Sequence, residues 1–116
     1  MSTTILANLE KLLGGPRDGA LLRYSLGNES LKAGDLAQAA LRFREAVELD
    51  AGYSAAWKLL GKTLAESGRT ADALEAYERG VVVAEQKGDL QAAREMSVFA
   101  KRLRKQLAAA LIPPSA

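Results

Sequence analysis

The sequence predicts an all-α fold of about six helices that pair into repeated helical hairpins. Helix-forming residues dominate, and no extended stretch alternates polar and apolar side chains as a half-buried strand would. The prolines stand at positions 16, 113 and 114, so residues 17–112 permit uninterrupted helices. The sequence also repeats itself with a period of 34 residues, a length typical of two-helix units.

We expect residues 1–116 to form a single domain. The chain has 116 residues, 48% hydrophobic and 26% charged, a balance that suits a small globular core. The formal net charge is +2. Residues 89–116 carry five basic and two acidic side chains, so the positive excess lies in the C-terminal segment.

Residues 2–15 are predicted to form an N-terminal helix. Their apolar side chains recur at helical spacing at positions 5, 6, 9, 12 and 13. The run Gly14-Gly15-Pro16 then ends the helix. A helix this short is marginal alone in water, so we expect it to dock on the rest of the chain.

Two repeats follow, residues 20–53 and residues 54–87. Aligned at a shift of 34, they share identical residues at six positions: Leu26 and Leu60, Gly27 and Gly61, Gly34 and Gly68, Ala37 and Ala71, Ala39 and Ala73, Val47 and Val81. Each repeat is interpreted as two helices joined by a glycine turn.

Glycines and capping residues define the predicted hairpins. Gly34 and Gly68 stand where a helix end favours a left-handed residue, and Asp35 and Thr70 are predicted to cap the helices that follow. Gly27 and its counterpart in the second repeat lie mid-helix, where glycine costs about 1 kcal/mol relative to alanine. Close approach of a second helix is the expected compensation.

Residues 88–110 are predicted to form a C-terminal capping helix, followed by a tail at residues 111–116. Apolar side chains recur every three or four residues along one stripe: Leu90, Ala93, Met96, Ala100, Leu103, Leu107 and Ala110. A repeat stack needs an atypical end unit, because its last repeat would otherwise expose an apolar face.

The pattern Trp57-x-x-Leu60-Gly61, followed by Ala73-x-x-x-Tyr77, resembles the tetratricopeptide repeat. The first repeat carries matching residues: Leu26, Gly27, Gly34, Ala39, Phe43 and Ala46. It departs from the family pattern at Arg23, which stands where a large aromatic residue is usual. The resemblance implies a right-handed superhelix of helical hairpins, with the single tryptophan in the core.

The same resemblance implies a non-catalytic adaptor or scaffold that binds a peptide or a partner helix. In this family the first helix of each hairpin lines a concave face. Carried over by position, the partner-binding residues are Tyr24, Asn28, Leu31, Lys58, Lys62, Ala65 and, from the last helix, Phe99. Two ammonium groups beside an amide and a phenol ring suit an acidic peptide or the C-terminal carboxylate of a peptide. Whether residues 3–13 occupy this groove is left open.

The composition argues against an enzyme and against a cofactor or metal. The chain has no cysteine, which excludes thiolate nucleophiles and zinc-thiolate sites, and no histidine, the commonest general base and metal ligand. It has neither a phosphate-binding loop nor a dinucleotide-binding glycine pattern. We therefore expect no catalytic, cofactor-binding or metal-binding residues.

Two alternative functions remain open from the sequence. The C-terminal helix could support a homodimeric structural module through residues 96–107, since its apolar positions cover a wide arc. The run Lys101–Lys105 could bind nucleic acid weakly, although Phe99 is the one aromatic residue nearby. The protein is expected to be a monomer or a weak homodimer.

A cytoplasmic location without membrane contact is the expectation from the apolar pattern. No lysine or arginine precedes an apolar stretch at the N-terminus, and no apolar run approaches the length of a membrane span.

Overall fold

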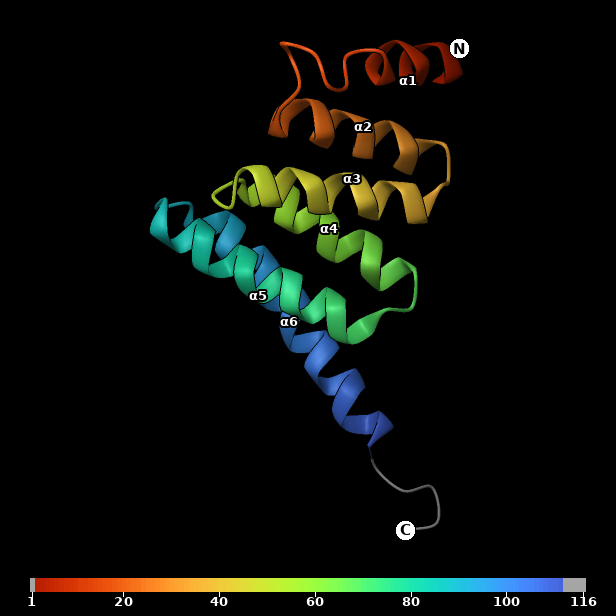
Figure 1. Ribbon diagram of the computed structural model, residues 1–116. Coiled ribbons are helices and arrows are strands. Elements are labelled where there is room, and N and C mark those ends of the chain that lie inside the picture. The colour runs from red at the N-terminus through yellow and green to blue at the C-terminus, as the bar shows by residue number, and fades with distance from the viewer. Residues whose placement is uncertain (1, 112–116) are drawn as a thin grey trace.

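The computed structural model describes residues 2–111 and shows six α-helices over that range (Figure 1). They are α1 (Ser2–Glu10), α2 (Ala20–Lys32), α3 (Leu36–Leu49), α4 (Ser54–Glu66), α5 (Thr70–Gln86) and α6 (Leu90–Ala110). The predicted all-α, helical-hairpin class is confirmed. Of the predicted tail, residues 112–116 lie outside the described residues.

The helices stack in chain order, with α1 and α6 at opposite ends (Figure 1). Consecutive helices run antiparallel, and the tightest packing joins α2 to α3, α4 to α5 and α5 to α6. Each hairpin therefore contacts mainly its neighbours along the stack, as expected of a repeat architecture.

Glycines let the two helices of each hairpin approach closely. A Cβ built on Gly27 would lie 2.6 Å from two atoms of the Phe43 ring, and one on Gly61 would lie 2.9 Å from the Tyr77 ring. Both rings are buried, Phe43 completely. The ring from the second helix thus fills the space above the glycine in both repeats, which is the predicted compensation for a mid-helix glycine.

Left-handed glycines close the predicted turns. Gly34 has φ +79° and Gly68 has φ +78°, as the sequence predicts. The next residue in each case donates its backbone N–H to a carbonyl five residues earlier, Asp35 to Ser30 at 3.0 Å and Arg69 to Leu64 at 2.9 Å. These bonds satisfy carbonyls that the end of the helix leaves without partners.

The two hairpins differ in how their second helices begin. Asp35 accepts a hydrogen bond from the Gln38 amide at 3.0 Å and caps α3 as predicted. The prediction for Thr70 is wrong, because α5 starts at Thr70 itself and Arg69 stands at the N-cap without a capping side-chain bond. Arg69 occupies the place of Asp35 because both residues follow the left-handed glycine directly.

Helix α1 is shorter than the predicted segment 2–15. It ends at Glu10, after which Leu12 donates to the carbonyl of Leu9 at 3.0 Å. This shorter-range bond tightens the chain into turns before the glycines are reached. Asp18 then accepts from the Gly14 amide at 2.8 Å and holds the connection to α2.

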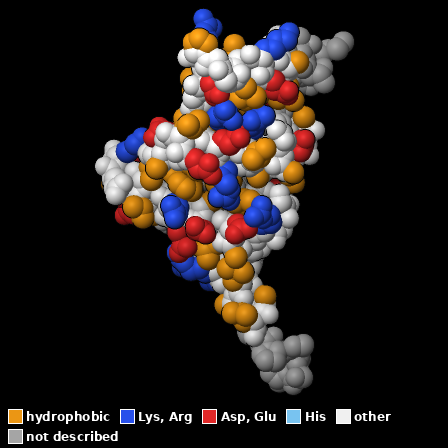
Figure 2. Space-filling view, in the orientation of Figure 1, with side chains coloured by type: hydrophobic (Ala, Val, Ile, Leu, Met, Phe, Trp, Pro, Cys, Tyr) orange, Lys and Arg blue, Asp and Glu red, His pale blue; other side chains and the backbone are white. Residues whose placement is uncertain are grey.

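Helix α6 completes the core at the C-terminal end of the stack. Its buried side chains are Ala93, Met96, Ala100 and Leu103. Leu90 and Ala110 depart from the predicted stripe: both are exposed, because they stand at the two ends of α6. Beyond the N-terminal end of α5, α6 extends away from the stack (Figures 1 and 2).

Candidate functional site

The structure places four of the seven predicted partner-binding residues in one groove between α4 and α6. The groove encloses about 600 Å³ and is lined by Lys58, Lys62, Ala65, Glu66, Tyr77, Glu95, Phe99, Arg102, Leu103 and Gln106. The predicted members are Lys58, Lys62, Ala65 and Phe99. None of the described side chains of α1 (residues 5–10) lines it, and α1 lies beside α2 at the far end of the stack (Figure 1).

The three predicted residues of α2 lie outside this groove. The ring of Tyr24 stacks on Tyr53 with centroids 4.9 Å apart, and it tilts against Phe43 at 5.8 Å. Leu31 packs against the core, and Asn28 is half-buried. Tyr24 and Leu31 are thus engaged in packing within the first repeat.

Two stacked rings form the apolar centre of the groove. The rings of Tyr77 and Phe99 lie 5.3 Å apart at an interplanar angle of 19°. Tyr77 is 3% exposed, and burial raises the pKa of its phenol to about 12. Phe99 is 36% exposed, and the Arg102 guanidinium lies over its ring at 5.7 Å. The centre can therefore accept an apolar side chain against Phe99.

Charged side chains surround these rings. Lys58 donates to Glu95 at 2.7 Å, and both side chains are about two-fifths exposed. The hydrogen bond from Lys58 lowers the pKa of Glu95, with a smaller contribution from Gln91. Among the described residues, Lys62 has no ion-pair partner within 4 Å. The groove therefore offers at least one cation that is not already neutralised.

Sequence reasoning missed Glu95, Arg102 and Tyr77 as groove residues. Glu95 and Arg102 share a helix face with Phe99, since they lie four residues before it and three residues after it. That spacing could have identified them once Phe99 was chosen. Tyr77 is both buried and part of the groove lining.

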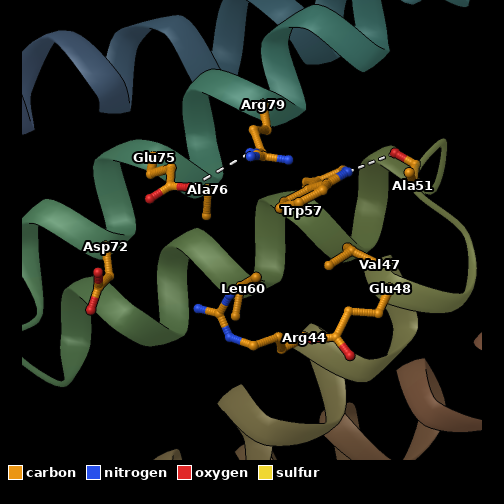
Figure 3. Close-up of a pocket in the computed structure, with 10 residues that line it drawn as sticks. All are labelled: Arg44, Val47, Glu48, Ala51, Trp57, Leu60, Asp72, Glu75, Ala76 and Arg79. Atoms are coloured by element: carbon orange, nitrogen blue, oxygen red, sulfur yellow. Dashed lines mark hydrogen bonds and ion pairs between the residues drawn. The ribbon is translucent and has the colours of Figure 1, made fainter.

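A second pocket of about 410 Å³ lies on the opposite side of α4, between α3 and α5 (Figure 3). Trp57 forms one wall, is 8% exposed and donates its indole N–H to the carbonyl of Ala51 at 2.8 Å. The predicted core position of Trp57 is confirmed. Arg79 lies over the indole at 5.8 Å and pairs with Glu75 at 3.6 Å.

The rim of this second pocket mixes charges of both signs. Arg44, Glu48 and Asp72 join the Arg79–Glu75 pair around it (Figure 3). On the face shown in Figure 2, basic and acidic side chains are likewise interspersed. Because neighbouring opposite charges offset one another, this pocket favours no one charge of ligand.

The predicted basic run at Lys101–Lys105 is partly engaged in contacts within the chain. Arg104 pairs with Glu78 on α5 at 3.1 Å, and Arg102 covers one face of Phe99. The Phe99 ring therefore contacts both the Arg102 guanidinium and the Tyr77 ring. Lys101 and Lys105 are exposed on the outer part of α6.

Across residues 2–111, no cluster of three or more acidic, histidine or cysteine side chains could hold a metal ion. Over the same residues, no helix combines the length and apolar character needed to cross a bilayer.

Comparison with known proteins relates the sequence to a repeat family. Residues 30–96 match the family model described as Tetratricopeptide repeat. A TPR repeat-containing protein of Pseudomonas aeruginosa, PA0015, is 46% identical over 99 residues, covering 85% of this chain and 94% of that protein.

Solved structures agree with that relationship. The solution structure of protein BPP2914 from Bordetella parapertussis has a TM-score of 0.74 and 38% identity, covering 90% of this chain and 91% of the other. The solution structure of a tetratricopeptide repeat domain protein from Salinibacter ruber has a TM-score of 0.69 and 32% identity, covering 76% of this chain and 88% of the other. The chain belongs to the tetratricopeptide repeat family.

Proposed function

We propose that this protein is a non-catalytic interaction module whose groove between α4 and α6 binds an acidic peptide segment. Tetratricopeptide repeat proteins are generally non-catalytic and bind proteins or peptides. The observation that carries the proposal is the pairing, in one groove, of a partly exposed aromatic ring at Phe99 with the cations Lys62 and Arg102.

The chemistry of the groove favours a ligand that combines apolar and acidic groups. An aliphatic or aromatic side chain would cover Phe99, while a carboxylate would accept from Lys62 on one wall and Arg102 on the other. Since these residues come from two helices held by the core, the groove needs little rearrangement on binding. The affinity should be modest, because the ligand loses conformational entropy against a short groove.

The two alternative functions receive less support. Nucleic-acid binding through Lys101–Lys105 would need several aromatic platforms for bases, and Phe99 is the one aromatic residue of α6. A homodimer through residues 96–107 would have Val98, which is 56% exposed, as an apolar contact. Antiparallel pairing of two such segments about their centre would however bring Lys101 of one copy near Arg102 of the other, which is unfavourable.

A charge-reversal experiment tests the proposal. The full chain is screened against immobilised peptides that combine acidic and apolar residues, and affinities are then measured by fluorescence anisotropy. We expect the double variant Lys62→Glu, Arg102→Glu to lose at least about tenfold in affinity, because two favourable charge pairs become repulsive. Circular dichroism confirms that the variant is folded.

The matched control reverses two cations outside the groove. The variant Lys101→Glu, Lys105→Glu changes the net charge equally on exposed positions that do not line the groove. It should bind the same peptides with little loss. Equal losses in the two variants would show a non-specific charge effect, and an absence of peptide binding by the wild-type chain would refute the proposal.

A further inference from the structure

We infer that Glu95 is a specificity-determining residue of the groove. In the free protein its carboxylate forms an ion pair with the Lys58 ammonium group, and it therefore competes with ligand carboxylates for that group. The inference rests on the proposed function and adds to it a residue that weakens binding. It follows from the position of Glu95 in the groove, its contacts and the exposure of its ion pair.

Glu95 stands where a ligand carboxylate would otherwise bind. Its Oε2 lies 2.7 Å from the Lys58 Nζ, and both residues line the groove from opposite helices. Among the ion pairs of the described residues, the Lys58–Glu95 pair is the one that joins α4 to α6. Gln91, one turn earlier on α6, donates from its Nε2 to the other carboxylate oxygen at 3.4 Å. The carboxylate is therefore held toward Lys58 before any ligand arrives.

The pair is exposed enough to be exchanged. Lys58 is 42% and Glu95 is 43% exposed at the side chain, so water screens their attraction and an incoming anion can reach them. A ligand carboxylate that binds Lys58 must displace Glu95 and then lies close to a second negative charge. The attraction between such a ligand carboxylate and Lys58 is therefore partly offset by repulsion from Glu95, so it adds less to the binding free energy.

The consequence is a preference for where the ligand places its charge. Lys62 has no competing ion pair among the described residues, and Arg102 contacts the face of Phe99. An acidic group near these two cations binds without displacing a carboxylate. Glu95 therefore directs the ligand's negative charge away from Lys58. It also lowers the affinity of the groove for peptides with many acidic residues.

The test uses the full chain and two matched probes. The acidic probe is the fluorescein-labelled, C-terminally amidated peptide Gly-Asp-Glu-Leu-Glu-Asp. The neutral probe replaces each acidic residue by its amide, giving Gly-Asn-Gln-Leu-Gln-Asn. We expect Glu95→Gln to raise the affinity for the acidic probe by about threefold or more, because Lys58 becomes available. The affinity for the neutral probe should stay unchanged.

Two controls separate competition from general repulsion. Glu66 also lines the groove but has no lysine partner among the described residues, so Glu66→Gln removes the same charge without freeing Lys58. We expect it to have a smaller effect than Glu95→Gln. In a Lys58→Met background, Glu95→Gln should lose most of its effect, because no ammonium group remains to be released.

Each outcome decides the matter. A gain with Glu95→Gln that depends on Lys58 supports the inference. An equal gain with Glu66→Gln, or a gain that persists in the Lys58→Met background, shows simple repulsion and overturns it. If the wild-type chain binds the acidic probe and Glu95→Gln changes nothing, the inference fails while the proposed function stands. If neither the wild type nor Glu95→Gln binds the acidic probe, both fail.

Discussion

At Gly27 and Gly61 the absence of a Cβ atom lets the two helices of each hairpin pack closely. An alanine at either position gains helix propensity but places its methyl group inside the van der Waals radius of a buried ring. We expect each alanine variant to lower the free energy of unfolding by about 1–2 kcal/mol, since overpacking outweighs the propensity gain. Gly27→Ala should be the more harmful, because its Cβ lies closer to the Phe43 ring.

Urea unfolding followed by circular dichroism measures this difference. A suitable control is Ser25→Ala on α2, at a partly exposed position, which raises helix propensity and removes one hydrogen bond to the Leu21 carbonyl without placing a methyl group against a buried ring. If both glycine variants were more stable than the wild type, the rings would have moved aside at little cost. The close-approach explanation of the two glycines would then be wrong.

Individual residues differ in how far the sequence predicts them. The periodicity identifies Trp57 and the paired glycines, because their roles depend on neighbours within the repeat. Arg23 looks like a departure from the family pattern, yet it pairs with Asp18 at 2.7 Å and with Glu45 on α3 at 3.0 Å. These partners could not be predicted, since a side chain's ion pairs depend on rotamers that periodicity does not specify.

The connection between α1 and α2 is held by the carboxylate of Asp18, whose pKa is lowered. Hydrogen bonds from the Arg23 side chain and the Gly14 amide lower the pKa of Asp18 from the ordinary 3.8 to about 2. A depressed pKa in the folded state means that Asp18 stabilises the fold above its unfolded pKa. This contribution is lost as the pH falls from about 4 through about 2.

We therefore expect Asp18→Asn to be less stable than the wild type at neutral pH and to respond less to acid between pH 4 and pH 2. The free energy of unfolding, measured in urea at pH 7, 4, 3 and 2, shows both effects. Glu85→Gln is the control, since that exposed carboxylate has no ion pair among the described residues. Parallel pH curves for the wild type and Asp18→Asn would refute the role of this carboxylate.

Among the helices, those of the repeats follow the sequence most closely. Helix α4 begins at Ser54 and α3 begins after Asp35, as the 34-residue period predicts. The end of α1 was predicted too late, because a change to shorter-range backbone bonds after Glu10 has no clear sequence signal. The Thr70 cap was wrong because the position of the left-handed glycine, not the chemistry of the next side chains, sets where α5 begins.

For the molecule as a whole, Met96 joins the last helix to the stack. It is fully buried, and it lies against Gly80 on α5 near the Trp57 side chain. We expect Met96→Ala to lower the free energy of unfolding by about 2–5 kcal/mol, because it leaves a cavity between α5 and α6. Since the groove needs α6, binding of the acidic probe should weaken as well.

Denaturant unfolding measures the loss, and Val98→Ala, at a position 56% exposed on the same helix, is the control. If Met96→Ala and Val98→Ala cost the same, α6 is not anchored through Met96. A stability loss without weaker binding would show that the groove keeps its shape independently of this contact.

The candidate site is only partly predictable because it is a property of several helices together. The resemblance to the repeat family, carried over by position, identifies Lys58, Lys62 and Phe99 as residues of a binding face. It does not show that Tyr24 stacks on Tyr53 within the first repeat. Nor does it show that Lys58 pairs with Glu95, which is 37 residues away along the chain. Such pairings depend on distances between helices, which one sequence does not contain.

The shared turn geometry of the two hairpins has a consequence for how such a protein can change its length. Gly34 and Gly68 close turns of the same shape, and each hairpin packs mainly on its neighbours. A tandem duplication of residues 54–87 would therefore insert a self-contained unit whose ends already fit the surfaces on either side. The groove would lengthen by one helix at each such event, so a single genetic step could change the size of the peptide that the proposed binding groove accommodates.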